Sequence, residues 1–188
     1  MVSSALPHEG KTLTVSNLAL TFSESYKRRV LLIDADLRQP SIQGVFGLAS
    51  GAGLCDDIRA PRQQRSAVQV SANLSVLLAG QVGADPMAEL SSDRMRALIE
   101  DAASQFDWVL VDTPPLCLLP DAHLVARVTD GVLLVIAAGS TPYQVVSDAI
   151  SKVGADRILG TVLNRTDARA LATKDYYLEY YKPAGATR

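Results

Sequence analysis

The stretch Ala5-Leu6-Pro7-His8-Glu9-Gly10-Lys11-Thr12 decides the fold that we expect for this chain. It ends in Gly-Lys-Thr and runs into a helical pattern of apolar residues, Leu13, Val15, Leu18, Ala19 and Phe22. A loop of this kind turns backbone N–H groups toward a phosphate at the start of a helix. The stretch therefore predicts that the chain binds a nucleoside triphosphate.

The position of this loop raises a question about the strand before it. Phosphate loops normally follow a buried parallel strand, which calls for about five apolar residues upstream. Only Met1 and Val2 are apolar there. We therefore expect a truncated N-terminal strand, either because the chain is an internal fragment or because the protein is a shortened form with an incomplete sheet.

The composition indicates one compact domain. The chain has 188 residues, of which 48% are hydrophobic and 20% are charged, and this balance excludes general disorder. The net charge of −2 supplies no basic excess that could neutralise the phosphates of a nucleic acid. We therefore expect no nucleic-acid partner.

Two further features concern cysteines and membranes. Cys55 and Cys117 lie far apart in the sequence, which favours free thiols in a reducing cytosol over a zinc site or a disulfide. The longest apolar stretch near the middle, residues 132–138, is too short to span a bilayer, and no secretion signal is present. We expect neither membrane insertion nor secretion of the chain itself.

Apolar runs of strand length alternate with helical patterns, which is typical of parallel βα units. Strands are predicted at residues 29–33, 74–78, 108–111, 132–136 and 158–163, and helices at 11–25, 91–105, 121–128 and 143–153. Residues 47–69 are interpreted as a loop with short helical pieces. The sequence thus predicts an α/β, three-layer P-loop NTPase fold, with a mostly parallel sheet flanked by helices. An ATP-binding domain over residues 1–168 would precede a tail over residues 169–188.

Carboxylates follow two of the predicted strands. Asp34 and Asp36 come after the strand at 29–33, and Asp112 comes after the strand at 108–111. Alternation along a strand would send Asp34 and Asp36 to the same side, at the edge where α/β sheets collect ligands. Such carboxylates suit Mg²⁺ binding and proton acceptance in phosphoryl transfer. The alternative is that these residues merely end strands or begin turns.

The loop residues have roles that their chemistry suggests. The Lys11 ammonium would lie against the β and γ phosphates, and the Thr12 hydroxyl would ligate Mg²⁺. Ala5 stands where the consensus has glycine, which is acceptable if that position does not require a positive φ. A chance Gly-Lys-Thr at an ordinary helix start is the alternative, and the carboxylate motifs on successive units argue against it.

These motifs together resemble the bacterial protein-tyrosine kinases of capsule and exopolysaccharide export, the BY-kinases. The likeness covers nearly the whole sequence. It rests on the loop 5–12, on the Asp-x-Asp-x-Arg element in Leu31-Leu32-Ile33-Asp34-Ala35-Asp36-Leu37-Arg38, and on Val109-Leu110-Val111-Asp112-Thr113-Pro114. Residues 38–41 and 85–90 are similar as well. The Asp-x-Asp-x-Arg element is the most discriminating of these.

The resemblance implies ATP and Mg²⁺ as cofactors, tyrosine as acceptor, and a set of site residues. Lys11, Asp34, Asp36 and Asp112 would be catalytic, and Thr12, Asp36 and Asp112 would hold the metal. The nucleotide would be bound by Pro7, His8, Glu9, Gly10, Lys11, Thr12, Leu13 and Asn164. For Asn164, which the wider ATPase class would place at the adenine, a turn-forming role at a strand end is the alternative.

Four of the six tyrosines fall near the end of the chain. Tyr176, Tyr177, Tyr180 and Tyr181 resemble the autophosphorylation tail of the family. Phosphorylation would add up to about two negative charges per tyrosine, so that several modified tails would repel one another. The alternative is an amphipathic terminal helix, because tyrosines four residues apart share a helix face.

Two other functions remain open from the sequence. A ParA/MinD-like ATPase would share the fold, but that class carries a signature lysine where this chain has Leu6. A non-catalytic nucleotide-binding regulator of polysaccharide export is the other possibility. We therefore predict an ATP-dependent protein-tyrosine kinase that autophosphorylates its terminal tyrosines and regulates exopolysaccharide synthesis and export.

The resemblance also implies partners. The family works with a membrane adaptor of polysaccharide export, which is either a separate protein or a region fused upstream. A Glu/Arg-rich helix upstream of the loop promotes ring-like assembly in the family, so we expect a homo-oligomer where such a segment is present. The expected location is cytoplasmic, at the inner face of the plasma membrane through the partner.

Overall fold

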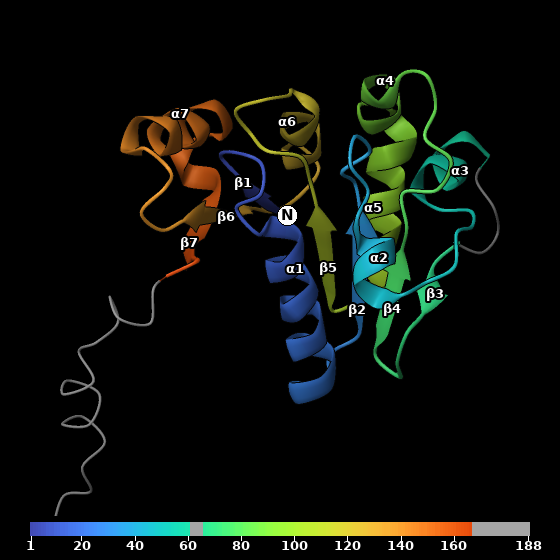
Figure 1. Cartoon of the computed structure of the whole chain (residues 1–188). Coiled ribbons are helices and arrows are strands. Elements are labelled where there is room, and N and C mark those ends of the chain that lie inside the picture. Colours follow the sequence, from blue (N-terminus) through green and yellow to red (C-terminus); the bar gives the residue numbers. More distant parts are fainter. Residues whose placement is uncertain (61–65, 167–188) are drawn as a thin grey trace, which may run out of the picture.

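The computed structural model describes residues 1–60 and 66–166, and within them it forms a twisted sheet with helices on both faces (Figure 1). The strand order is β3-β4-β2-β5-β1-β6-β7. The strands are β1 Val2–Ser4, β2 Val30–Asp34, β3 Val68–Gln69, β4 Leu74–Leu77, β5 Trp108–Asp112, β6 Val132–Ala137 and β7 Ile158–Asn164. All neighbouring pairs are parallel except β3 with β4. The predicted α/β fold with a mostly parallel sheet is confirmed.

The helices connect the strands in the order that the periodicity predicts. They are α1 Lys11–Leu20, α2 Ile42–Phe46, α3 Leu54–Arg59, α4 Pro86–Leu90, α5 Asp93–Gln105, α6 Asp121–Ala126 and α7 Tyr143–Val153. After α1 the chain continues as a π-helical turn, η1 Thr21–Ser25, so the predicted helix over residues 11–25 has its expected length but changes its hydrogen-bond pattern. A short 3₁₀ turn, η2 Ala155–Arg157, precedes β7.

Alternation along the buried strands separates two apolar cores, one on each face of the sheet. In β2, Leu31 and Ile33 pack into the core that includes residues of α5, α6 and α7, whereas Val30 and Leu32 pack into the core beneath α1. All four of these side chains are fully buried. A strand that is apolar on both faces is what a parallel sheet covered on both sides requires. The fold is therefore three layers deep.

The short strand before the loop is present and lies near the centre of the sheet. Val2 pairs with Asp112 of β5, and Val2, Ser3 and Ser4 pair with Leu133, Leu134 and Val135 of β6. Ser3 Oγ donates to the carbonyl of Pro114 and Ser4 Oγ to that of Leu6, each at 2.7 Å. These bonds let two serines be buried in a strand. β1 has three residues and is shorter than its neighbours β5 and β6, as expected for the strand before the loop.

Local features of the fold agree with the sequence prediction in part. Ser92 caps α5 by accepting a hydrogen bond from Met95 N at 3.2 Å. The edge strand β3 was not predicted, because its two exposed residues carry no pattern. Cys55 and Cys117 are free thiols, as predicted. None of the helices in the described part of the chain is long and apolar enough to cross a membrane.

Candidate active site

The loop between β1 and α1 takes its shape from Gly10. This residue caps α1 with φ 94° and ψ 22°, a left-handed conformation that favours glycine. A Cβ atom at this position would collide with Nδ2 of Asn164. Asn164 itself lies at the end of β7 and donates from Nδ2 to the carbonyl of Glu9 at 2.8 Å. The last strand of the sheet therefore holds the loop in place through Asn164, and the contact of Asn164 with a nucleotide stays a prediction.

The buried side chain of Glu9 also holds this loop in place. Its carboxylate is buried and accepts hydrogen bonds from Leu6 N at 2.6 Å, from Ala137 N at 3.1 Å and from the Thr141 hydroxyl. The side chain thus ties the loop to the end of β6. The sequence analysis placed Glu9 among the nucleotide-binding residues, and the structure turns its carboxylate away from the cleft, which leaves its backbone for that role.

Two other loop positions agree with the expected geometry. Ala5 is buried and is not among the residues with positive φ, so alanine is sterically acceptable where the consensus has glycine. His8 has a φ of 61°, and it lines the cleft together with Pro7, Gly10 and Lys11. The loop therefore has the conformation of a phosphate cradle without its first glycine.

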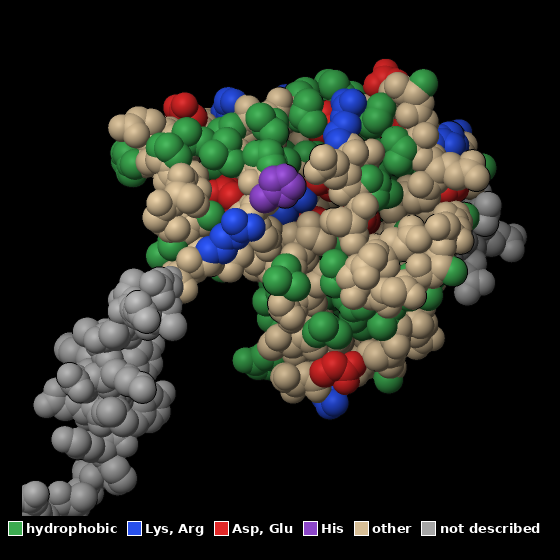
Figure 2. All heavy atoms as spheres, viewed as in Figure 1, with side chains coloured by type: hydrophobic (Ala, Val, Ile, Leu, Met, Phe, Trp, Pro, Cys, Tyr) green, Lys and Arg blue, Asp and Glu red, His purple; other side chains and the backbone are tan. Residues whose placement is uncertain are grey.

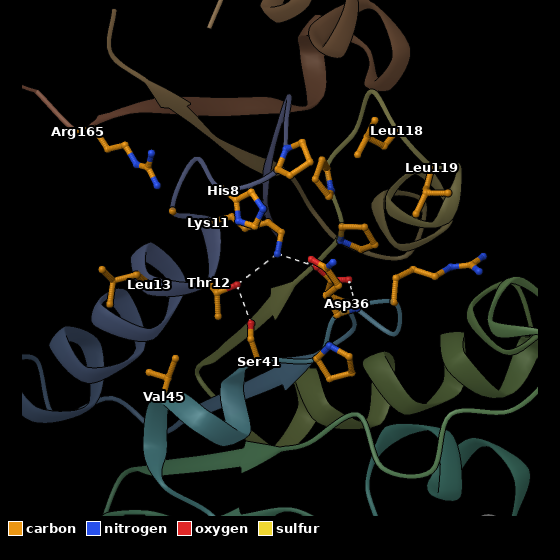
Figure 3. A pocket seen from close by; sticks show the side chains of 17 residues that line it. His8, Lys11, Thr12, Leu13, Asp36, Ser41, Val45, Leu118, Leu119 and Arg165 are labelled. Atoms are coloured by element: carbon orange, nitrogen blue, oxygen red, sulfur yellow. Dashed lines mark hydrogen bonds and ion pairs between the residues drawn. The ribbon is translucent and has the colours of Figure 1, made fainter. Parts of the chain in front are cut away.

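Four side chains from three elements meet in front of this loop. Lys11 Nζ lies 2.7 Å from Asp36 Oδ2 and 3.9 Å from Asp112 Oδ1. Thr12 Oγ1 donates to Asp112 Oδ2 at 2.6 Å, and Lys11 Nζ donates to Thr12 Oγ1 at 3.3 Å. The sequence prediction that the ends of two strands converge on the loop is confirmed for Asp36 and Asp112. Figure 3 shows Lys11 between Thr12 and Asp36.

Asp112 combines burial with an unused oxygen atom. It is fully buried, and this burial raises the pKa of its carboxyl to about 7, although Lys11 and the Thr12 hydroxyl pull it down. Its Oδ1 makes no hydrogen bond within the described residues. An unsatisfied buried oxygen beside a threonine hydroxyl fits Mg²⁺, which prefers hard oxygen ligands and binds through one or two carboxylates plus substrate phosphates.

Asp34 has a different position from the one that alternation predicted. Its carboxylate accepts hydrogen bonds from the backbone N–H groups of Ser41 and Ile42 at 3.0 Å each, and from Asp36 N at 3.3 Å. Burial raises its pKa to about 6. Since β2 ends at Asp34, alternation does not extend to Asp36, and only Asp36 lines the Lys11 cleft. Asp34 therefore shapes the turn that presents Asp36.

The cleft in front of the loop is open and has a volume of about 740 Å³. Lys11 and Asp36 lie between apolar side chains, with Val45 on one side and Leu118 and Leu119 on the other (Figure 3). Figure 2 shows a histidine together with basic side chains on this face of the molecule. The apolar side chains that line the cleft, here called the apolar wall, are those of Pro40, Val45, Pro114, Pro115, Leu118 and Leu119. A site with an apolar wall and a few polar groups is typical of small-molecule binding.

Two residues of the site were missed by the sequence analysis. Ser41 Oγ donates to Thr12 Oγ1 at 3.3 Å, and the buried Asp121 accepts a hydrogen bond from Arg38 Nε at 2.9 Å. Arg38 belongs to the Asp-x-Asp-x-Arg element, but no spacing in the sequence predicts that it pairs with Asp121. The predicted acceptors Tyr176, Tyr177, Tyr180 and Tyr181 lie outside the described residues.

Comparison with curated proteins finds several bacterial relatives. Tyrosine-protein kinase YwqD of Bacillus subtilis is 35% identical over 181 residues, which cover 94% of this chain and 76% of YwqD. Tyrosine-protein kinase wzc of Salmonella typhimurium is 33% identical and the match covers 96% of this chain but 26% of wzc. The succinoglycan biosynthesis transport protein ExoP of Rhizobium meliloti is 35% identical over 90% of this chain and 22% of ExoP. No protein-family profile matches the sequence.

Solved structures give the same result for the fold. The VpsO kinase domain superimposes with a TM-score of 0.82 at 33% identity, covering 89% of this chain and 84% of that domain. The kinase domain of Escherichia coli tyrosine kinase ETK has a TM-score of 0.80 at 31% identity, covering 89% of this chain and 68% of the other. MinD of Pyrococcus horikoshii, solved with Mg-ADP, has a TM-score of 0.70 at 19% identity and shares the fold alone.

Proposed function

The chain belongs to the bacterial tyrosine-protein kinase family, and we propose that it transfers the γ-phosphate of ATP to tyrosine side chains. The observation that carries this proposal is the meeting of Lys11, Thr12, Asp36 and Asp112 in front of a phosphate loop. The neighbouring folds of the MinD type support nucleotide binding only at the level of the fold. The four groups supply the charges that phosphoryl transfer needs.

The triphosphate would lie along the loop, with its oxygens against the backbone N–H groups that open α1 and against Lys11. The Lys11 side chain is 12% exposed, and its ammonium group is held over the cleft by Asp36 and Asp112, so it is already placed for an anion. Thr12 Oγ1 and the free oxygen of Asp112 would hold Mg²⁺, which neutralises charge on the β and γ phosphates. These two oxygens belong to side chains that already touch.

We assign to Asp36 the role of general base for the acceptor tyrosine. Its Oδ1 accepts a hydrogen bond from Gln39 N at 3.1 Å and its Oδ2 pairs with Lys11, so the carboxylate is held at the cleft. It would take the proton of the tyrosine hydroxyl while the phenolic oxygen forms a bond to the γ-phosphorus. The bond from that phosphorus to the β–γ bridging oxygen breaks, and ADP leaves. The apolar wall would receive the tyrosine ring.

The proposed acceptors are Tyr176, Tyr177, Tyr180 and Tyr181 on neighbouring copies of the chain, in the tail over residues 169–188. Family membership supports a role in exopolysaccharide or capsule synthesis and export, because one relative is named a succinoglycan transport protein. A membrane adaptor, separate or fused upstream, would bring the kinase domain to the inner face of the plasma membrane. Self-association would depend on a segment upstream of the loop.

The test is to incubate the purified chain with ATP and Mg²⁺ and to locate phosphotyrosine by mass spectrometry. We expect phosphate on the terminal tyrosines, and we expect none in Lys11→Met, since the phosphates lose their cation. Lys27→Met removes an exposed lysine remote from the cleft and is the matched control. ATP hydrolysis without tyrosine modification, also in the presence of an adaptor, would favour the MinD-like ATPase or the non-catalytic regulator instead.

A further inference from the structure

A second charged site lies away from the Lys11 cleft, between the last turns of α6 and α7. A small hollow of about 130 Å³ is lined there by His123, Arg127, Lys152 and Arg157, with Ala126 and Val153. Both helices return the chain from the carboxyl edge of the sheet to the amino edge, and Arg157 directly precedes β7. None of these residues lines the Lys11 cleft. We refer to this group as the basic hollow.

The residues that line the basic hollow carry positive charge and no negative charge. Four of its six lining residues are basic and no carboxylate is among the described residues that line it. Like charges repel when they are brought together, so such a cluster is unfavourable unless an anion or solvent compensates it. Among the ion pairs found in the described residues, none involves these four side chains. The cluster therefore has the charge of an anion site.

Two buried nitrogen atoms of the basic hollow also lack hydrogen-bond partners within the described residues. Nε2 of His123 and Nε of Arg157 are buried, and neither has a hydrogen-bond partner in the described part of the chain. Leaving a buried polar group without a partner costs about 1–3 kcal/mol. Arg157 is held rigidly, because its guanidinium donates to the carbonyls of Ala126 and Thr129 at the end of α6. Lys152 Nζ makes one long bond of 3.4 Å to the carbonyl of Cys117.

We propose that the basic hollow binds a phosphoryl dianion, either inorganic phosphate or the phosphate of an aryl phosphate such as a phosphotyrosine. A water molecule takes about 30 Å³ of liquid volume, so the hollow holds about four of them. This volume is far below that of the Lys11 cleft and has room for one phosphoryl group. Arginine, lysine and histidine are the donors that bind tetrahedral oxyanions through charge-assisted hydrogen bonds.

The two histidines of the chain make the test specific. His8 lies in the phosphate loop and His123 in the basic hollow, so the imidazole proton NMR signals report one site each. The wild-type protein would be saturated with ADP and Mg²⁺, which fills the loop, and then titrated with inorganic phosphate or phenyl phosphate at constant ionic strength. His8→Gln assigns the two signals.

The expected result is a saturable shift of the His123 signal while the His8 signal stays in place. The double variant Arg127→Gln/Lys152→Gln removes two exposed cations of the basic hollow and should weaken binding at least tenfold. The matched double variant Arg28→Gln/Arg96→Gln removes two exposed arginines elsewhere and should bind like the wild type.

Tighter binding of phenyl phosphate than of phosphate would identify an aryl phosphate as the ligand, and the reverse order would identify free phosphate. An unmoved His123 signal, or equal binding in the wild type and the Arg127→Gln/Lys152→Gln variant, would overturn the proposal. Because ADP occupies the loop throughout, this result is independent of whether the protein phosphorylates tyrosine.

Discussion

The ends of β2 and β5 are neighbours in the sheet and each carries an aspartate, yet the two carboxylates have different hydrogen-bond partners. Asp34 and Asp112 pair in register, and both are fully buried. Asp34 accepts three backbone N–H groups, whereas Asp112 accepts one threonine hydroxyl and keeps one oxygen free of hydrogen bonds within the described residues. The difference teaches that the partners of a buried carboxylate decide whether it builds the structure or serves a ligand.

The largest expected effect is on the rate of phosphorylation and comes from Asp112→Asn. The substitution keeps the size of the side chain but removes the charge beside Thr12 and Lys11. Removing one preorganised electrostatic group from an active site costs about 10²–10³ in rate. We expect a loss of this size in the rate of phosphotyrosine formation, with a thermal unfolding midpoint no lower than that of the wild type. A variant that unfolds early would show that Asp112 is structural like Asp34.

Thr12→Ala tests the metal side of the β5 end. It removes the hydroxyl that donates to Asp112 Oδ2 at 2.6 Å, and with it one proposed oxygen ligand of Mg²⁺. Loss of a partner of a metal site typically weakens metal affinity or activity about 10–100-fold. The rate of phosphorylation measured against Mg²⁺ concentration should therefore reach its half-maximum at a higher concentration. An unchanged Mg²⁺ dependence would place the metal elsewhere.

Asp34→Asn should act on stability more than on chemistry. Asparagine offers one acceptor oxygen, and its amide group would turn a donor toward backbone N–H groups, so some of these groups lose their partner. We expect the free energy of unfolding in urea at pH 7 to fall by about 1–3 kcal/mol. If Asp34→Asn unfolds like the wild type but loses phosphorylation as Asp112→Asn does, the distinction between the two strand ends is wrong.

The smallest effect is expected from Ser41→Ala, where the two strand ends meet. Ser41 N donates to Asp34, and Ser41 Oγ donates to Thr12 at 3.3 Å from an exposed position. The substitution keeps the first bond and removes only the second, longer one. We expect the phosphorylation rate to fall by at most about tenfold, since a typical hydrogen bond contributes about 0.5–1.5 kcal/mol and about 1.4 kcal/mol corresponds to tenfold in rate. A larger loss would make the hydroxyl part of the metal site.

Local patterns were sufficient to predict most of the framework. The phosphate loop, five of the strands and the arrival of Asp36 and Asp112 at one edge follow from short apolar runs and from the rule that parallel strands end at the same side. These features depend on neighbours in the sequence. The family resemblance rested on the same segments and was confirmed by the comparisons.

Polar partners distant in the sequence could not be predicted. The sequence did not predict that Ser3 and Ser4 belong to β1. These serines are buried through hydrogen bonds to Pro114 and Leu6, and no pattern in residues 1–4 indicates such bonds. Asp34 and Asp36 differ because β2 ends between them, and Glu9 turns inward because Ala137 and Thr141 offer donors across more than 120 residues. Such partners appear only when the chain is folded.

β1 also joins the two halves of the sheet. Four strands, β3, β4, β2 and β5, lie on one side of it and β6 and β7 on the other, and β1 pairs with β5 through the Val2–Asp112 pair. The first half carries Asp36 and Asp112, and the second carries Asn164. The phosphate loop directly follows β1, so a nucleotide bound by the loop would hold the two halves of the sheet together. Amide hydrogen exchange at Val2, Ser3 and Ser4 would then measure the free energy of opening between the two halves.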